Sequence, residues 1–271
     1  MLSQPEKARI FRALHDREGA FLIPNPWDRG TARLLQNMGF EAIATSSAGF
    51  AYSQGKPDTA VGRDAMLSHV ADLASAVDLP VSGDLENGYG DAPEVAAETI
   101  RLAAAAGLVG GSIEDATGRT NEPIYPINLA VERIHAAADA AHALPFPFLL
   151  TARCENFLYG RPNLDDTILR LRAYQQAGAD VLYAPGLRRL EDIAQVVRSV
   201  DRPVNVLASP AFTVAALSDL GVRRISVGST LARIALTAFH SAAQEMQDQG
   251  TFSRAKDAIS YADFNEMFRQ F

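Results

Sequence analysis

Residues 81–91 read VSGDLENGYGD, and residues 92–107 continue as APEVAAETIRLAAAAG. The first stretch passes from a β-type run into a polar turn with glycines, and the second is rich in alanine and leucine with helical spacing. This order of strand, turn and helix repeats along the chain. The β-type runs lie about 20 to 40 residues apart, as expected when strands alternate with helices. The eight runs are 21–25, 41–47, 80–86, 109–115, 146–153, 180–185, 203–208 and 224–228.

Eight strand–helix units predict a single α/β domain over residues 1–271, folded as a closed (β/α)8 TIM barrel, an architecture that typically takes about 250 residues. The main alternative is an open doubly wound sheet. Two observations favour the barrel: no G-x-G-x-x-G follows the first strand, and polar residues follow many strands rather than one switch point. We expect an N-terminal helix within residues 1–20 and a C-terminal helical extension over residues 250–271.

Capping residues predict where helices begin. Asp28 and Asn163 each precede a helical segment, and Asp91 opens a D-A-P-E pattern that resembles a capping box with proline in the first turn. Asp115, after the fourth strand, is interpreted as another cap. Near the end, residues 261–271 predict an amphipathic helix whose apolar face must pack on the barrel flank or on a neighbouring subunit. That face carries Phe264, Met267, Phe268 and Phe271.

Composition narrows the class of protein. The chain has 271 residues, a formal net charge of −7, 48% hydrophobic residues and one cysteine. A phosphate backbone needs a basic face, so the acidic balance argues against nucleic acid as the main partner. No apolar stretch approaches about 18 residues, and the charged start resembles no secretion signal, so no membrane partner is expected. A lone cysteine fits a cytoplasmic, reducing compartment.

Polar residues gather where the predicted strands end, which is the active-site edge of a barrel. Asp84 and Glu86 lie two residues apart and therefore share one side of their strand, and Glu114 ends the next strand. Three neighbouring carboxylates repel one another unless a cation or protons intervene. Because no Cys or His accompanies them, the set favours Mg²⁺ or Mn²⁺ over Zn²⁺, with some ligands acting through water.

Other polar groups at the same edge are candidates for substrate binding. Arg153 ends the fifth strand, where its guanidinium can pair with a carboxylate or stabilise an enolate oxygen. The turn SSAG at residues 46–49 offers hydroxyl and backbone N–H groups to an anion. Asn205 lies on the seventh strand, and Trp27 and Tyr52 are candidates for the pocket wall.

Two residue types that often act in catalysis are assigned to packing instead. Cys154 follows Arg153 in the same strand, so strand alternation turns it away from the site. The histidines all fall in predicted helices, which argues against a catalytic histidine. They are His15, His69, His135, His142 and His240.

In combination, four segments resemble the isocitrate lyase / phosphoenolpyruvate mutase superfamily over nearly the whole chain from Phe21 onward. The resemblance implies a Mg²⁺-dependent enzyme that cleaves or forms a bond beside a pyruvate-like enolate. It also implies a homodimer or homotetramer in which the C-terminal helix is exchanged between subunits. The four segments are TSSAGFAYSQGKPD (45–58), VSGDLENGYGD (81–91), GSIEDATG (111–118) and LLTARCENF (149–157).

The resemblance further implies roles for individual residues. Asp84 would bind Mg²⁺ directly, and Glu86 and Glu114 would complete the metal set, Glu114 through water. Arg153, Asp58 and Glu114 would be catalytic, with Arg153 beside the enolate oxygen and Asp58 close to the metal. The substrate would contact Ser46, Ser47, Gly49, Asp84, Arg153, Asn205, Asn121, Trp27 and Tyr52.

The loop at residues 116–125, ATGRTNEPIY, departs from the superfamily. Isocitrate and methylisocitrate lyases carry K-(K/R)-C-G-H there, with the cysteine as proton-transfer acid, whereas this loop has neither Cys nor His. Glu122 would repel a migrating phosphoryl group, which disfavours mutase activity. We expect Arg119, Asn121 and Tyr125 on a loop that gates the site.

The sequence therefore predicts a Mg²⁺-dependent lyase-type enzyme that cleaves or decarboxylates a small 2-oxo acid resembling oxaloacetate, through a metal-bound enolate. Three alternatives stay open. One is phosphonopyruvate hydrolase or phosphoenolpyruvate mutase-like C–P chemistry, and another is a different Mg²⁺-dependent barrel aldolase. The third is a non-catalytic 2-oxo acid binding protein, which the missing loop acid suggests.

Overall fold

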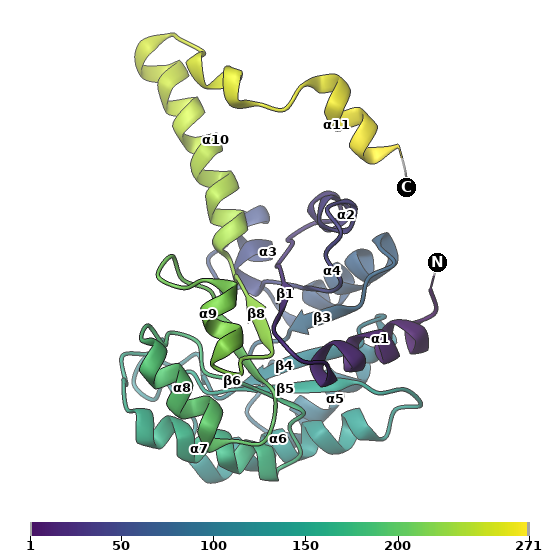
Figure 1. The fold of residues 1–271 in the computed structure, drawn as a ribbon, viewed down its shortest axis with the longest axis vertical. Coiled ribbons are helices and arrows are strands. Elements are labelled where there is room, and N and C mark those ends of the chain that lie inside the picture. The colour runs from purple at the N-terminus through teal and green to yellow at the C-terminus, as the bar shows by residue number, and fades with distance from the viewer. Residues whose placement is uncertain (1, 270–271) are drawn as a thin grey trace.

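Eight parallel strands form a nearly closed barrel with helices around its outside in the computed structural model, which describes residues 2–269 (Figure 1). Each observed strand lies inside its predicted range, so the predicted (β/α)8 barrel is confirmed. The strands are β1 (Phe21–Ile23), β2 (Ile43–Ala44), β3 (Val81–Asp84), β4 (Gly110–Glu114), β5 (Leu149–Arg153), β6 (Val181–Tyr183), β7 (Val204–Leu207) and β8 (Arg224–Ser226).

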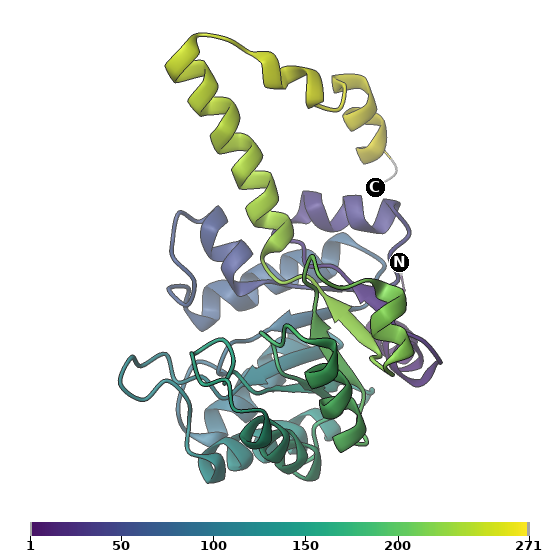
Figure 2. The same cartoon turned by 60° about the vertical axis from the view of Figure 1, so that its left-hand side comes forward.

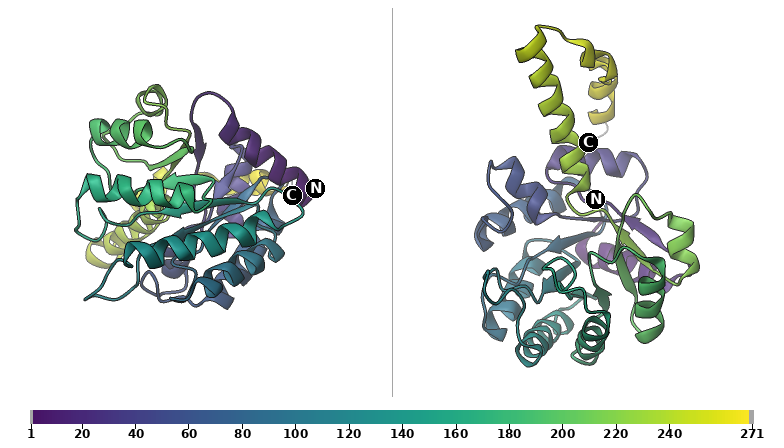
Figure 3. Two further views of the ribbon diagram at one scale, coloured as in Figure 1. Left: turned by 90° about the horizontal axis from the view of Figure 1, so that it is seen from below. Right: turned by 90° about the vertical axis from the view of Figure 1, so that its left-hand side faces the viewer.

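Helices connect the strands and extend the chain at both ends, and Figure 3 shows them around the outside of the sheet. Within residues 2–269, none is both long and apolar enough to cross a membrane. The helices are α1 (Gln4–Asp16), α2 (Arg29–Asn37), α3 (Ser47–Ser53), α4 (Arg63–Ala76), α5 (Pro93–Ala105), α6 (Ile127–His142), α7 (Leu164–Gln176), α8 (Leu190–Ser199), α9 (Val214–Asp219), α10 (Thr230–Gln249), a 3-10 turn (Ser253–Asp257) and α11 (Tyr261–Phe268).

The strand order is β1-β8-β7-β6-β5-β4-β3-β2, so the carboxyl ends of all strands meet at one rim. Between β1 and β2, the Ala44 N–H donates to the Pro24 carbonyl at 3.0 Å, and the Asn25 amide donates to the Thr45 carbonyl at 2.9 Å. Asn25 also accepts from the Gly228 N–H at 2.9 Å. This one side chain therefore ties the first strand to both of its neighbours at the rim.

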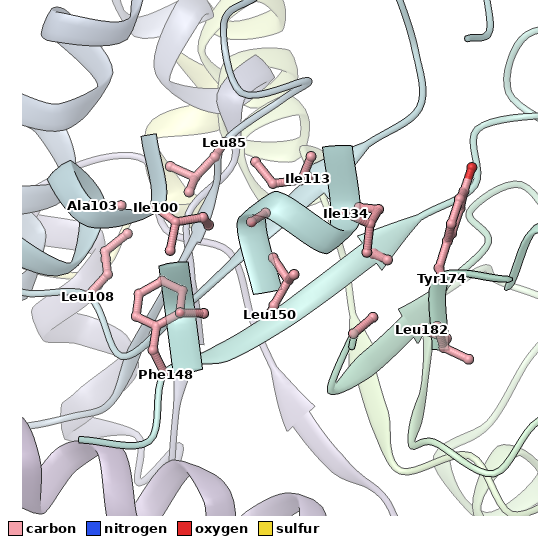
Figure 4. Packing of buried hydrophobic residues seen from close by; sticks show 14 of the residues in the cluster. Leu85, Ile100, Ala103, Leu108, Ile113, Ile134, Phe148, Leu150, Tyr174 and Leu182 are labelled. Carbon is pink, nitrogen blue, oxygen red and sulfur yellow. The ribbon is translucent and has the colours of Figure 1, made fainter. Parts of the chain in front are cut away.

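The main hydrophobic core lies between the strands and the helices outside them. Figure 4 shows Leu85, Ile113 and Leu150 from the strand segments packed near Ile100 of α5 and Ile134 of α6. These side chains are at most 2% exposed. Burying each such aliphatic side chain stabilises the fold by about 1.5–3 kcal/mol, so the outer shell holds the strands in place.

Helix α1 covers the amino-terminal end of the barrel. Its Phe11 packs edge-to-face against Phe21 of β1, with ring centroids 6.4 Å apart, and against His15 at 4.7 Å. Lys7 Nζ donates to the Val77 carbonyl at 2.6 Å, after α4. Because α1 closes this end, the carboxyl rim is the open side of the barrel.

Two of the four predicted helix caps are confirmed. Asp28 and Asn163 cap α2 and α7, each accepting from the N–H three residues further on. Asp91 does not cap α5, because Ala92 occupies the capping position and Pro93 begins the helix. The predicted capping box is therefore wrong at Asp91, although the proline stands in the first turn as expected.

Helix α10 and the segment after it extend beyond the barrel before the chain turns back (Figure 2). Phe239, Phe252 and Tyr261 along this arm are 73%, 68% and 87% exposed. The arm ends near α2, where the Asn37 amide donates to the Met267 carbonyl at 2.5 Å. Helix α11 confirms the helix predicted from residue 261, while Phe271 of its predicted apolar face lies outside the described residues.

Candidate active site

Two adjoining cavities lie at the carboxyl rim, and most of the residues singled out from the sequence line them. The first has a volume of about 180 Å³, and the second, about 890 Å³, is lined by Glu86 and Glu114. The cavities adjoin because Glu114 and Arg153 are paired neighbours in β4 and β5. The predicted residues that line the first cavity are Ser46, Ser47, Asp58, Asp84, Arg153 and Asn205.

The Arg153 guanidinium joins three carboxylates at the end of β5. Nη1 lies 2.8 Å from Asp84 Oδ1, Nη2 lies 3.1 Å from Glu114 Oε2, and Nε lies 2.9 Å from Glu155 Oε1. Burial disfavours the charged guanidinium, but the three carboxylates outweigh burial and raise the pKa of Arg153. The site thus holds a fixed cation that can stabilise negative charge on a bound ligand.

Asp84 connects Arg153 to the turn after β2. Its Oδ2 accepts from the Ser47 N–H at 3.1 Å, and its own N–H donates to Thr45 Oγ1 at 2.8 Å. Ser47 Oγ in turn donates to Asp58 Oδ1 at 3.1 Å. Burial, followed by the charge of Asp84, raises the pKa of Asp58. One chain of hydrogen bonds therefore holds this predicted set together.

Glu86 lies beside this set, and its buried Oε1 has no hydrogen-bond partner among the described residues. Its φ is +48°, in the left-handed region that side-chain-bearing residues rarely adopt. Burial, followed by the charges of Asp84 and Asp58, raises the pKa of Glu86 to about 8. A buried carboxylate oxygen without a donor, in a strained backbone, fits a cation ligand.

Several carboxyl groups surround the single guanidinium of Arg153 at the carboxyl rim. Burial raises the pKa of Glu114 and of Glu155, while Arg153 acts in the opposite sense. Within residues 2–269, no three such side chains lie close enough to hold a metal ion as they stand. An oxygen-only set with few direct ligands suits Mg²⁺, which usually keeps several waters. The carboxyl groups around Arg153 are Asp58, Asp84, Glu86, Glu114 and Glu155.

Four predicted substrate-binding residues are not among the described lining residues of either cavity. The Gly49 N–H donates to Ser46 Oγ at 3.1 Å, and a Cβ on Gly49 would lie 3.1 Å from Trp27 Cβ. Trp27 therefore packs over the turn. Tyr52 is half-buried on α3, and Asn121 is exposed in the loop after β4. Their roles stay predictions.

The loop after β4 is anchored at its far end. Tyr125 is fully buried, its hydroxyl donates to Asp91 Oδ1 at 2.5 Å, and the Arg133 guanidinium lies 4.4 Å from its ring centroid. Arg119 donates to the other Asp91 oxygen at 2.7 Å. Tyr125 thus anchors the loop rather than lying on its exposed part, and this contact explains why Asp91 is unavailable as a helix cap.

Asp115, expected to cap a helix, is instead the centre of a buried network, so that prediction is wrong. Its Oδ1 accepts from the Glu155 N–H at 2.8 Å, and its Oδ2 accepts from the Tyr174 hydroxyl at 2.6 Å and from Arg170 at 3.2 Å. Because Glu155 lies two residues after Arg153, this network positions the strand end that carries the guanidinium.

Strand alternation accounts for several neighbours of the site. Cys154 is fully buried in the outer core, as alternation predicted. The same rule would have found Glu155, which lies two residues after the predicted Arg153. Arg224, Ser226 and Tyr183 also line the first cavity. Tyr183 and Ser226 end β6 and β8 but were not among the predicted residues. Arg224 was missed because it lies at the amino end of β8, whereas the candidates were drawn from the carboxyl ends of the strands.

Comparison with known proteins assigns the family. Residues 11–247 match the sequence profile of phosphoenolpyruvate phosphomutase. The chain belongs to the phosphoenolpyruvate phosphomutase family. An uncharacterized protein of Mycobacterium tuberculosis is 32% identical over 93% of both chains. 2-methylisocitrate lyase of Bacillus subtilis is 29% identical over 98% of this chain and 93% of the relative, and oxaloacetate decarboxylase of Paraburkholderia xenovorans is 27% identical over 100% and 95%.

Solved structures agree with this assignment. A Burkholderia cenocepacia J2315 protein, named only provisionally as a lyase/mutase, superposes with a TM-score of 0.96 at 61% identity, over 98% of this chain and 97% of the other. Oxaloacetate acetylhydrolase, solved with its product oxalate, superposes with a TM-score of 0.87 at 25% identity, over 96% and 93%. The superfamily resemblance is confirmed, and the named curated relatives are lyases or decarboxylases.

Proposed function

We propose that this member of the phosphoenolpyruvate phosphomutase family is a Mg²⁺-dependent lyase that cleaves or decarboxylates a small 2-oxo dicarboxylate of the oxaloacetate type. The observation that carries the proposal is the buried Arg153 guanidinium, fixed against Asp84 and Glu114 beside the Ser47 turn. The relatives named oxaloacetate decarboxylase and oxaloacetate acetylhydrolase support this substrate class.

Asp84, Glu86 and Glu114 would hold the Mg²⁺. The fit rests on the unpartnered Oε1 of Glu86 and on the excess of carboxyl groups over the one guanidinium. Few direct ligands are needed, because Mg²⁺ binds readily through its own waters. When bound, the ion would offset the carboxylates and polarise the 2-oxo group of the substrate.

The protein's own groups account for the charge movement. When the bond between C3 and C4 of the substrate breaks, C4 leaves as CO₂ or as a carbonyl fragment. The electron pair left on C3 is delocalised into the 2-oxo group, and negative charge develops on the 2-oxo oxygen. The N–H donors of Arg153 stabilise this charge, and the Ser46–Ser47 turn holds the neighbouring carboxylate. The carbon that lost its bond then needs a proton, and Asp58, whose pKa is raised, is our candidate to carry it.

The loop after β4 supports this simpler chemistry over 2-methylisocitrate cleavage. Neither Cys nor His stands in residues 116–125, so the loop lacks the thiol acid expected of that reaction. Glu122 is 79% exposed at the loop tip and lies 4.0 Å from Arg119, where it presents a negative charge. We infer that this charge disfavours transfer of a phosphoryl group past the loop.

The test measures products with Mg²⁺ present. We expect carbon–carbon cleavage products or CO₂ from oxaloacetate and related 2-oxo acids, and no phosphate from phosphonopyruvate. Asp84→Asn should abolish turnover and Mg²⁺ dependence, whereas Asp72→Asn, at an exposed carboxylate paired with Arg29, should leave both unchanged. Unchanged turnover in Asp84→Asn would contradict the proposal, and phosphate release would favour C–P chemistry instead.

A binding protein without catalysis would give a different result. It would be stabilised by 2-oxo acids in a thermal-shift screen with and without Mg²⁺, yet turn over none of them. The screen and the product assay together therefore separate the lyase from a sensor, because only the lyase shows both stabilisation and product.

For the assembly, we propose a homodimer or homotetramer in the cytoplasm, with α11 packed on a neighbouring subunit. The exposed aromatic side chains of the C-terminal arm support this, because Phe239 and Phe252 are more than two-thirds exposed in one chain. The single free thiol, Cys154, suits a reducing compartment.

A further inference from the structure

The interior of the barrel is polar beneath the level of Arg153. TIM barrels are usually filled there by bulky aliphatic side chains. In this chain the first cavity is lined by small hydroxyl-bearing residues on the inner faces of three strands, and its lining extends to Arg224 at the start of β8. The small residues are Ser82, Ser112 and Ser226.

Arg224 is buried among neutral partners. Its Nε donates to Asn205 Oδ1 at 2.9 Å, its Nη2 donates to Thr151 Oγ1 at 2.9 Å, and its Nη1 lies 3.5 Å from His15 Nε2. His15 is neutral, because burial and the charge of Arg224 lower its pKa to about 3, while its Nδ1 faces the Phe11 carbonyl at 2.8 Å. Among the described residues, no carboxylate pairs with Arg224.

A buried cation without a countercharge is costly, so the arrangement calls for an anion. Burial lowers the pKa of Arg224 to about 10, which still leaves it protonated at neutral pH. A guanidinium has five N–H donors, and the three contacts leave one further N–H on each terminal nitrogen. Those two donors suit one carboxylate.

The position of Thr151 relates Arg224 to the candidate active site. Thr151 lies two residues before Arg153 on the same side of β5, so the Arg224 contact lies roughly 6.6 Å nearer the barrel floor than Arg153, at about 3.3 Å per residue. Both arginines line the same cavity. A short dianion can therefore meet one guanidinium at each end.

Building on the proposed function, we propose that Arg224, with Thr151 and Asn205, forms a subsite for the second carboxylate of the substrate. Arg153 faces the 2-oxo end, and Arg224 receives the far carboxylate from below. The subsite selects short 2-oxo dicarboxylates over monocarboxylates such as pyruvate, because a monocarboxylate leaves Arg224 without a countercharge.

Calorimetric titration with Mg²⁺ present tests the subsite, using 3,3-difluorooxaloacetate as the dicarboxylate and pyruvate as the monocarboxylate. Arg224→Met should weaken dicarboxylate binding about 10- to 100-fold, the range for one charge-assisted contact, and leave pyruvate binding unchanged. Arg223→Met is the matched control, since that guanidinium donates to the Arg17 carbonyl instead. If Arg224→Met does not fold, Arg224→Gln keeps hydrogen-bond donors without the charge and should show the same selective loss.

The remaining outcomes distinguish failure of the Arg224 subsite from failure of the proposed function. Equal weakening of both ligands in Arg224→Gln would overturn the subsite and leave the proposed function standing. Failure of the unaltered protein to bind either ligand would overturn the proposed function, and the subsite with it. Stabilisation of the unaltered protein by inorganic phosphate alone, lost in Arg224→Gln while dicarboxylate binding is retained, would assign Arg224 to an inorganic anion and overturn the subsite.

Discussion

Replacing Arg153 by methionine removes the guanidinium that contacts three carboxylates at the carboxyl rim. Asp84, Glu114 and Glu155 have side-chain exposures of 18%, 10% and 2%, so water can compensate little of their charge. Removing one partner of a buried ion pair typically costs about 3–5 kcal/mol. At about 2 °C per kcal/mol for a chain of this size, the midpoint of thermal unfolding should fall by about 6–10 °C.

The stability of Arg153→Met depends on pH because its carboxyl groups have lost their positive partner. Burial already raises the pKa of Glu114 and of Glu155, and without Arg153 these two pKa values rise further, so the variant loses stability relative to the unaltered protein as pH increases. Mg²⁺ should restore part of the loss, because it supplies positive charge to the same oxygens. Calorimetric melts at two pH values, each with and without Mg²⁺, measure both effects.

Arg17→Met is the control for Arg153→Met. Arg17 makes a two-pronged pair with Glu41 at 2.7 and 2.6 Å, but both side chains are more than 40% exposed, so its loss should cost at most about 1 kcal/mol. The reasoning fails if Arg153→Met melts as little below the unaltered protein as Arg17→Met does. It fails equally if Mg²⁺ stabilises both variants to the same extent.

Three further outcomes are expected. His15→Gln should remove a pH dependence of stability, measurable by urea unfolding. Burial lowers the pKa of folded His15 to about 3 from its ordinary value of 6.5, so its contribution is full above pH 6.5 and falls by about 2 kcal/mol at about pH 5. Gly110→Ala should destabilise the folded protein by about 1–3 kcal/mol in the same assay, because the added Cβ would lie 2.9 Å from the Leu149 carbonyl oxygen. Gly62→Ala is the control and should not destabilise it, because a Cβ there would meet no atom of the described residues within 4 Å. A chain ending at Gln249 should form a smaller assembly in light scattering, and an unchanged mass would contradict helix exchange.

Local patterns were enough to predict the strands and the starts of α2 and α7. A buried parallel strand needs a short apolar run, and the next helix needs its own cap, so both signals lie within a few residues of the element they define. Asp28 and Asn163 succeed as predicted caps because their acceptors lie three residues away.

Asp91 and Asp115 fail as predicted caps because their partners are distant in the sequence. Asp91 receives Tyr125, which follows 34 residues later, and Asp115 receives Tyr174, which follows 59 residues later. A capping pattern describes what a carboxylate can do locally, and it cannot show that a hydroxyl from another strand–helix unit competes for the same oxygen. Such competition is strongest at the carboxyl rim, where all eight units converge.

The proposed selectivity for dicarboxylates also depends on residues that are distant in the sequence. The rim residues Asp84 and Arg153 could be found from strand ends, because each strand contributes one position to the same layer. Arg224 lies at the opposite end of its strand, and its relevance depends on Thr151, a residue 73 positions away that brings the guanidinium under Arg153. If Arg224 binds the far carboxylate, the residues at the barrel floor select substrates by length and charge. The loop after β4 then controls access to the site at the carboxyl rim. The two controls are then separable, since the loop can change without altering the floor.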